Sequence, residues 1–337
     1  MSMSTKDPII VAVTGGGGQI AYSLLPSLVS GNVFGPDQPV KLSLLDITPA
    51  MAVLDGVRME MEDLAYPLYA GCTCTDDPEV CFTNADIVVF LGAFPRKEGM
   101  ERKDVMAKNV GIFNAQGAAL KKAKPSVKCL VIGNPANTNA AILAQAAAGA
   151  VPAKSISALT RLDHNRARSL AASTVGACVE SVSGVIIWGN HSSTQYPDVR
   201  HATAEGKAIL DDATKQFFEG DFITTIQKRG AAIIAARKLS SAASAAKAIC
   251  DHLRDWMLGT APGVTVSMGV FSNTYGYDES LCYSRPCICT GGEWFVKEGL
   301  EVDEFSRAKM DATAAELKEE LALANKLLRP APYPAMN

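Results

Sequence analysis

Short apolar runs alternate with longer amphipathic segments through the first half of the chain. The segments at residues 19–30, 49–65 and 103–123 repeat apolar positions at helical spacing, which predicts helices. The runs that alternate with them are short and continuous, which predicts strands buried on both faces of a sheet. These predicted strands are Pro8–Val13, Val40–Asp46, Ala85–Gly92 and Lys128–Asn134.

The second half of the chain follows a less regular pattern. After about residue 160 the apolar run GVIIWGN precedes a polar loop, and an alanine-rich segment predicts one long helix from about Gly230 to Met257. The stretches VTVSMGVF and RPCICT favour strands, and a final helix is predicted from about Asp303 to Leu328. The whole pattern indicates an α/β protein, with a doubly wound parallel sheet of the Rossmann type in residues 1–158 and a mixed α+β domain in residues 159–337.

Composition and charge narrow the classes of function. Hydrophobic residues make up 48% of the 337 positions, which suits a globular protein with a large core, and the net charge is −3. This charge gives no broad electrostatic case for a nucleic acid or an anionic membrane as a partner. No apolar run reaches the roughly 18 residues that span a bilayer. The segment MSMSTKDP has neither the basic nor the apolar region of a secretion signal.

The cysteines and histidines do not follow the spacing of a metal site. Nine cysteines are scattered along the chain without a Cys-x-x-Cys pair, and there are four histidines. This usage disfavours zinc and suits reduced thiols. We therefore expect no bound metal and a cytoplasmic location.

The sequence TGGGGQIA, at Thr14–Ala21, lies between the first predicted strand and the first predicted helix. A chain that passes close to a pyrophosphate has no room for Cβ atoms, and the start of a helix attracts negative charge. The run fits G-x-G-x-x-A from Gly16 and G-x-x-G-x-x-A from Gly15, and a flexible turn is the alternative interpretation. The predicted dinucleotide contacts are Gly15, Gly16, Gly17, Gly18, Gln19, Ile20 and Ala21.

Asp46, at the end of the second predicted strand, favours the dinucleotide interpretation. A carboxylate there can accept hydrogen bonds from the adenosine ribose of NAD, and it would repel the extra phosphate of NADP. Asp46 follows Gly18 by 28 positions rather than the usual interval of about 20. The loop Gly31–Pro39 accounts for the excess. The predicted cofactor is therefore NAD.

A charged loop, GAFPRKEGMERKD, follows the third predicted strand at Gly92–Asp104. In a parallel α/β sheet this position belongs to an active-site loop. Arg96 and Arg102 are candidate anion binders, because a guanidinium pairs with a carboxylate in a two-pronged contact. Taken alone, the loop would more often be a solvated charged segment; its position reverses that preference in favour of binding.

The sequence RLDHNRA, at Arg161–Ala167, places three common catalytic side chains within four positions. The segment predicts a helix, and neighbouring residues on a helix point about 100° apart, so Asp163 and His164 do not face each other. Asp163 and Arg166 are three positions apart and share a face. If Asp163 orients an imidazole, that imidazole comes from elsewhere in the chain.

His191, in the loop IWGNHSSTQYPDV, supplies such an imidazole. It follows an apolar strand and comes 28 positions after Asp163. An Asp–His pair raises the basicity of the imidazole and fixes its tautomer, as general acid–base catalysis requires. A lone histidine is more often structural, which is the interpretation that we give to His164; His201 and His252 have no supporting context.

Long segments of the chain resemble the cytosolic malate dehydrogenases. The matching strings include TGGGGQIAYSLL, LLDITP, PRKEGMERKD, GNPANTN, LTRLDHNRA, IIWGNHSSTQYPDV and RKLSSAASAAKAICDH. They extend from the first strand to the last part of the chain and are far more specific than a glycine fingerprint. The resemblance implies an NAD-binding Rossmann domain, a mixed catalytic domain, a homodimer and the interconversion of malate and oxaloacetate.

The resemblance also implies roles for individual residues. His191 would donate and accept the proton, with Asp163 as its partner. Arg166 would hold the carboxylate beside the reacting carbon, Arg96 the distal carboxylate, and Arg102 would polarise the carbonyl. Asn134 would contact both substrate and cofactor. The remaining matches to cofactor-binding positions are Asn109, Gln116, Ile132 and Gly133.

Three other interpretations stay open at this point. The chain could be a dehydrogenase for another 2-hydroxy acid, of the lactate or aromatic class, although a monocarboxylate would give Arg96 no partner. It could be a non-catalytic NAD-binding protein, which would have no need of Asp163, His191 and the arginines. It could be specific for NADP, which Asp46 disfavours.

Overall fold

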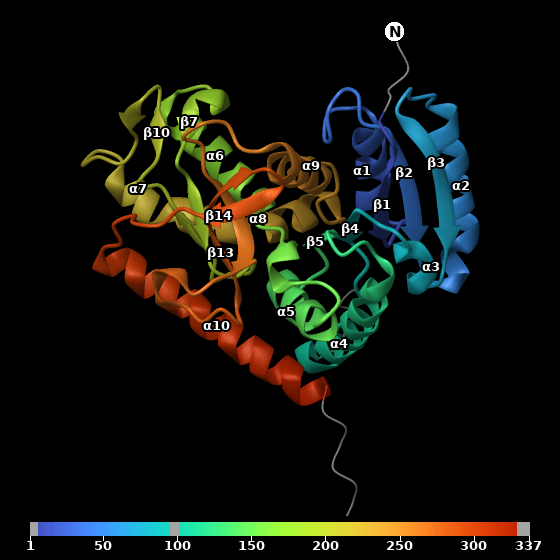
Figure 1. The fold of residues 1–337 in the computed structure, drawn as a ribbon. Coiled ribbons are helices and arrows are strands. Elements are labelled where there is room, and N and C mark those ends of the chain that lie inside the picture. The colour runs from blue at the N-terminus through green and yellow to red at the C-terminus, as the bar shows by residue number, and fades with distance from the viewer. Residues whose placement is uncertain (1–5, 95–100, 329–337) are drawn as a thin grey trace, which may run out of the picture.

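A long, mixed sheet runs through the protein. The computed structural model describes residues 6–94 and 101–328, and of Arg102 only the backbone. In these residues the largest sheet has nine strands in the order β14-β13-β12-β6-β5-β4-β1-β2-β3 (Figure 1). Its parallel part comprises β1 (Ile9–Thr14), β2 (Val40–Leu45), β3 (Tyr69–Thr75), β4 (Ile87–Phe90), β5 (Lys128–Val131) and β6 (Ile156–Ala158). The antiparallel extension comprises β12 (Val266–Phe271), β13 (Cys282–Thr290) and β14 (Glu293–Val296).

Two smaller sheets lie in the second half of the chain. One pairs β8 (Ile186–Trp188) with β9 (Tyr196–Asp198) in antiparallel fashion. The other joins β7 (Val182–Ser183), β10 (Thr203–Ala204) and β11 (Lys207–Ala208). Because β8 and β9 form a hairpin, the residues between them make a loop with both ends fixed.

Helices cover the large sheet and build the second half (Figure 1). Those of the first half are α1 (Gln19–Val29), α2 (Met51–Asp63), α3 (Pro78–Phe82), α4 (Arg102–Ala119) and α5 (Ala136–Ala146). Those of the second half are α6 (Arg161–Val175), α7 (Lys215–Glu219), α8 (Asp221–Arg237), α9 (Ala243–Leu258) and α10 (Glu304–Leu328). Short 3₁₀ turns occur at Thr48–Ala50, Leu120–Lys122, Ala153–Ser155, Val179–Ser181 and Thr274–Gly276. None of the described helices is both long and apolar enough to cross a membrane.

The large sheet separates two large apolar layers of the core, and a smaller third cluster surrounds Trp256. Along β1, Val11 and Val13 belong to the layer that contains α1 and α9, whereas Ala12 belongs to the layer that contains α4 and α5. This alternation follows from the period of two along a strand. All three side chains are fully buried, and burying a valine contributes roughly 1.5–3 kcal/mol. The prediction of an apolar strand covered on both faces is therefore confirmed.

One prediction about secondary structure is wrong, and some elements were not predicted. The single helix from about Gly230 to Met257 is two helices, α8 and α9, because Lys238 has left-handed backbone angles (φ 61°) and ends α8. The turn that follows carries Ser240 and Ser241. The edge strand β3 was also missed, since its sequence YAGCTCT has small, half-exposed residues instead of a strongly apolar run.

Candidate active site

The candidate site lies where the carboxyl ends of the parallel strands meet elements of the second half. At the end of β1, Thr14 is paired with Leu45 of β2 and Phe90 of β4, so the loops after these strands leave the sheet at one level. A cavity of about 360 Å³ opens nearby. Its lining includes residues from five separate segments: Ile20, Asn134, Asp163, Arg166, His191 and Ser241.

Asp163 and His191 form a partly buried hydrogen-bonded pair. Nδ1 of His191 contacts Oδ2 of Asp163, and the aspartate side chain is fully buried. Burial opposes the ionisation of Asp163, but the charge and hydrogen bond of His191, together with Arg166, hold the pKa of the carboxyl below its ordinary value. Burial likewise opposes protonation of His191, and Asp163 outweighs it, so the pKa of the imidazole is raised. The pairing expected from the sequence is present.

Arg166 joins this pair from the next turn of α6. Its Nη1 lies 3.3 Å from Oδ1 of Asp163, and its Nη2 donates to Oγ of Ser241 at 3.1 Å. Nε of Arg166 is buried without a hydrogen-bond partner. Burial lowers the pKa of the guanidinium, against the charge of Asp163. A buried guanidinium with an unused donor at the edge of a cavity is suited to bind a carboxylate.

The other histidines have structural surroundings. Nδ1 of His164 lies 3.0 Å from Oγ of Ser267, whose oxygen also accepts the backbone N–H of Ile187. Burial lowers the pKa of His164 well below its ordinary value. His201 contacts the carbonyl oxygen of Glu301, and His252 is buried in the core beside Trp256. His164 thus points into the core and not toward Asp163.

The glycine loop fits a dinucleotide pyrophosphate. Gly15 has a φ of 67°, and a Cβ there would lie 2.9 Å from the backbone of Gly92. No side chain caps the start of α1 at Gly18, which leaves the N–H groups of the first turn facing outward with the helix dipole behind them. This is the environment that an anionic group needs.

Asp46 is positioned beside this loop by β2. Its Oδ2 accepts the backbone N–H of Gly17 at 3.0 Å, and its Oδ1 accepts the N–H of Ile47 at 2.8 Å. The carboxylate therefore fixes the loop and keeps lone pairs for further donors. A half-buried carboxylate in this place suits the ribose hydroxyls of NAD.

Asn109 connects α4 to two loops beside the cavity. Its side chain is fully buried, Oδ1 accepts the N–H of Phe94, and Nδ2 donates to the carbonyl oxygens of Phe94 and Asn134. The amide thus ties α4 to the loops after β4 and β5 and has no exposed surface to offer a ligand. The direct cofactor contact expected of Asn109 stays a prediction from the sequence.

The other expected contacts from this half lie on α4 and after β5. Gln116 lies on α4 with its amide oxygen buried and without a hydrogen-bond partner. Ile132 and Asn134 line the cavity. At Gly133, a Cβ would lie 2.8 Å from Cβ of Ala93, so a side chain would push apart the loops after β4 and β5.

The two arginines of the charged loop are described unequally. Arg96 lies outside the described residues. Arg102 is the first residue of α4. The structure thus leaves their expected roles as predictions from the sequence.

The sequence did not point to two side chains that support the central group. Ser241 holds Arg166, and Gln195 hydrogen-bonds to Asp163 and so helps to keep that pKa low. Both are small or neutral polar residues in loops, where nothing in the local pattern separates a supporting role from solvent contact.

Comparison of the sequence with models of known protein families shows the family of this chain. The family model described as the lactate/malate dehydrogenase NAD binding domain matches residues 9–157. A second family model, described as the lactate/malate dehydrogenase alpha/beta C-terminal domain, matches residues 160–327. The chain belongs to the lactate/malate dehydrogenase family.

Individual members of this family resemble the chain over nearly its whole length. It is 54% identical to a malate dehydrogenase of Nicotiana tabacum, covering 96% of this chain and 99% of the relative. It is also 54% identical to the cytoplasmic malate dehydrogenase of Homo sapiens, covering 94% and 96%. Among solved structures, a malate dehydrogenase from Naegleria fowleri superimposes with a TM-score of 0.92 at 43% identity, covering 96% and 99%. A Trichomonas vaginalis lactate dehydrogenase in complex with NADH and oxamate gives 0.90 at 38%, covering 95% and 99%.

Proposed function

We propose that this protein interconverts malate and oxaloacetate with NAD, using His191 as the acid–base group and Asp163 as its partner. The observation that carries the proposal is the hydrogen-bonded group of the buried Asp163 with His191 and Arg166 beside one cavity. The identity to relatives named malate dehydrogenase supports the substrate, and several of these relatives are named cytoplasmic, which supports a cytoplasmic location. We also infer the domain boundary at residues 158/159, between the two matched segments.

The mechanism follows from the charges in the site. When bound, the nicotinamide accepts a hydride from malate or supplies one to oxaloacetate. His191 removes the hydroxyl proton when malate is oxidised, and it donates a proton when oxaloacetate is reduced. Asp163 stabilises the imidazolium, which is the protonated form of His191 in both directions. Arg166 binds the carboxylate beside the reacting carbon. We assign polarisation of the carbonyl to Arg102 and the distal carboxylate to Arg96.

The cofactor would be held by both halves of the first domain. The glycine loop and the start of α1 would hold the pyrophosphate, and Asp46 the adenosine ribose. Ile20, Ile132 and Asn134, which line the cavity, would adjoin the nicotinamide.

A dehydrogenase for a monocarboxylate is the second candidate, because a lactate dehydrogenase is among the similar structures. Steady-state oxidation of NADH and NADPH with oxaloacetate, pyruvate and phenylpyruvate tests both candidates. We expect oxaloacetate to be the best substrate, and NADH to be preferred by at least 2–3 kcal/mol, because NADPH would bring a phosphate against Asp46. Asp46→Ser should reduce this preference. Equal efficiency with NADH and NADPH in the unmodified protein would contradict our assignment of Asp46.

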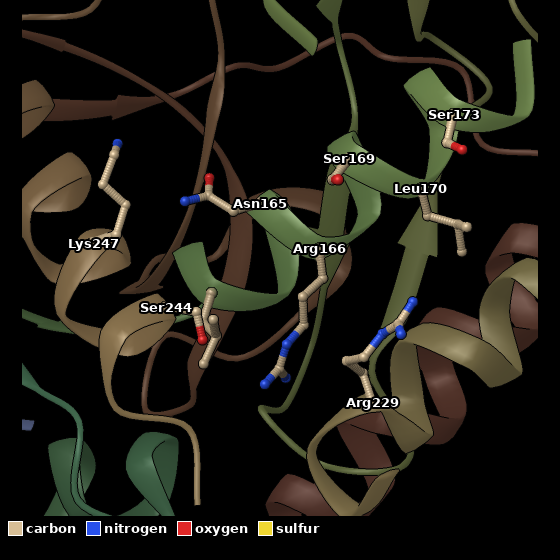
Figure 2. Close-up of a pocket in the computed structure, with 9 residues that line it drawn as sticks. Asn165, Arg166, Ser169, Leu170, Ser173, Arg229, Ser244 and Lys247 are labelled. Atoms are coloured by element: carbon tan, nitrogen blue, oxygen red, sulfur yellow. The ribbon is translucent and has the colours of Figure 1, made fainter. Parts of the chain in front are cut away.

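We further propose that the protein is a homodimer in which α2 of one copy packs on the second copy between α6, α8 and α9. A cavity of about 510 Å³ lies between these three helices (Figure 2). Among the described residues that line it, Arg166, Arg229 and Lys247 are basic and none is acidic. A surface of this kind needs an acidic partner.

The exposed face of α2 has the complementary character. Val53 and Met59 are about half exposed, and a Cβ on Gly56 would meet nothing within 4 Å. Glu60 and Asp63 are exposed on the same helix. An apolar face with acidic residues around it is typical of an interface.

Sedimentation velocity tests the dimer. We expect a particle of twice the 35.6 kDa of one chain, and Arg229→Glu should shift it toward the monomer by placing a carboxylate opposite the acidic α2. Lys318→Glu, an equal change of charge on α10, is the control and should leave the dimer intact. A monomer at micromolar concentration in the unmodified protein would refute the proposal.

A further inference from the structure

The loop that carries His191 depends on the last helix of the protein for its position. The loop lies between β8 and β9, and Asp163 contacts the imidazole at its centre. Its backbone and its other side chains need separate support. The described contacts show that much of this support comes from α10, more than 100 residues later in the chain.

The helix approaches the loop very closely at Gly189. This glycine has a φ of 89°, and a Cβ there would lie 2.0 Å from Cγ2 of Thr313 on α10. Only glycine allows both this backbone conformation and this contact. Next along the loop, the backbone N–H of Asn190 donates to Oγ1 of Thr313 at 2.9 Å.

One turn along α10, a single carboxylate oxygen accepts hydrogen bonds from three polar side chains of the loop. Oε2 of Glu316 accepts Nδ2 of Asn190 at 2.9 Å and Oγ1 of Thr194 at 2.6 Å, and it also accepts the hydroxyl of Ser192. These residues lie on both sides of His191 in the sequence. Hydrogen bonds to an ionised acceptor are the stronger kind, so Glu316 fixes both flanks of the histidine.

The backbone of His191 itself is held from α5. Its N–H donates to Oδ1 of Asn137 at 2.9 Å, and Nδ2 of Asn137 donates to the carbonyl oxygen of Cys282 at 2.7 Å. Asn137 is fully buried. It fixes one point of the loop, whereas Glu316 fixes the residues around that point.

We propose that Glu316 is a positioning residue for catalysis, which sets the distance between His191 and Asp163 by holding Asn190, Ser192 and Thr194. This inference rests on the proposed role of His191. A catalytic group that moves by about 1 Å can lose about 10²-fold in rate. A loosened loop would also separate the imidazole from Asp163, the group that raises its pKa.

The test compares Glu316→Ala and Glu316→Gln with the unmodified protein. We expect Glu316→Ala to lower kcat for oxaloacetate reduction by roughly 10- to 100-fold. The dissociation constant for NADH, measured by fluorescence, should stay within about twofold, because the glycine loop leads into α1, which packs in a different apolar layer from α10. The pH at which kcat/KM falls should also decrease in Glu316→Ala. Glu316→Gln should recover part of kcat, since its amide oxygen can still accept hydrogen bonds.

Two further variants separate positioning from folding. Glu319→Ala removes an exposed carboxylate three positions along α10 and should leave all these quantities unchanged. Thr194→Val removes the hydroxyl that donates to Glu316 from the loop side. The double variant Thr194→Val/Glu316→Ala should lower kcat less than the product of the two single effects, because both changes remove the same hydrogen bond.

The outcomes that would overturn the proposal are distinct from a failure of the proposed function. An unmodified protein without activity on oxaloacetate would refute the function itself. If the unmodified protein is active, and a folded Glu316→Ala keeps kcat within twofold with an unchanged pH profile, Glu316 does not position His191. The same conclusion follows if Glu316→Ala lowers only the melting temperature.

Discussion

His191→Asn should lose most turnover and keep NADH binding. Asparagine cannot exchange a proton near neutral pH, and a positioned acid–base group contributes about 10²–10⁴-fold to a rate. The glycine loop before α1 and Asp46 after β2, which would bind the cofactor, are unaffected by the change. Steady-state kcat and NADH fluorescence titration measure the two quantities separately. Loss of NADH binding together with turnover would show that His191 has a role in the cofactor site.

Asp163→Asn should show how the pair sets the pH dependence. Reduction of oxaloacetate needs a protonated imidazole, so kcat/KM should be high below the raised pKa of His191 and fall as the pH rises through it. Without the aspartate charge the pKa of His191 falls, because burial then acts unopposed. The decline in kcat/KM should therefore move to lower pH, and turnover at neutral pH should decrease.

The control for this pair is His164→Asn. His164 is buried against Ser267, so its replacement should lower the melting temperature and affect kcat of the folded enzyme far less than His191→Asn does. If a stably folded His164→Asn loses as much turnover as His191→Asn, our assignment of the acid–base group is wrong.

Arg96→Gln should change the class of substrate. Malate and lactate share the carboxylate that Arg166 can bind, and only a four-carbon diacid has a second one at the far end. A charge-assisted two-pronged contact in a closed site contributes on the order of 2–5 kcal/mol. The change should therefore lower kcat/KM for oxaloacetate by roughly 30- to 5,000-fold. Pyruvate should improve, since its methyl group would no longer lie against a bare guanidinium.

Arg102→Gln is the matched comparison in the same loop. Every 2-keto acid has a carbonyl to polarise, so this change should lower kcat/KM for oxaloacetate and pyruvate alike. The deciding quantity is the ratio of the two values in each variant. If Arg102→Gln shifts the ratio and Arg96→Gln does not, the roles of the two arginines are exchanged. If neither shifts it, specificity for the diacid resides elsewhere in the cavity.

Sequence reasoning succeeded where a local rule had one solution. The angle between neighbours on a helix excluded a pair between Asp163 and His164. In the structure Asp163 contacts His191 instead, in agreement with that reasoning. The same rule placed Arg166 beside Asp163. The glycine run and Asp46 were linked because parallel strands end at one edge of a sheet, and the hydrogen bond from Gly17 to Asp46 shows them in contact.

The tertiary structure decided what depends on two distant segments at once. The break at Lys238 brings Ser241 to Arg166, and Asn109 turns inward to the loops after β4 and β5. Glu316 accepts a hydrogen bond from Ser192 because α10 packs against the loop after β8. In the sequence each is an ordinary polar residue in a helix or a loop. Hydrophobic periodicity indicates which side of a helix or strand is buried. The partner of a buried polar group depends on how whole elements pack against each other. A single sequence carries no local signal of that packing.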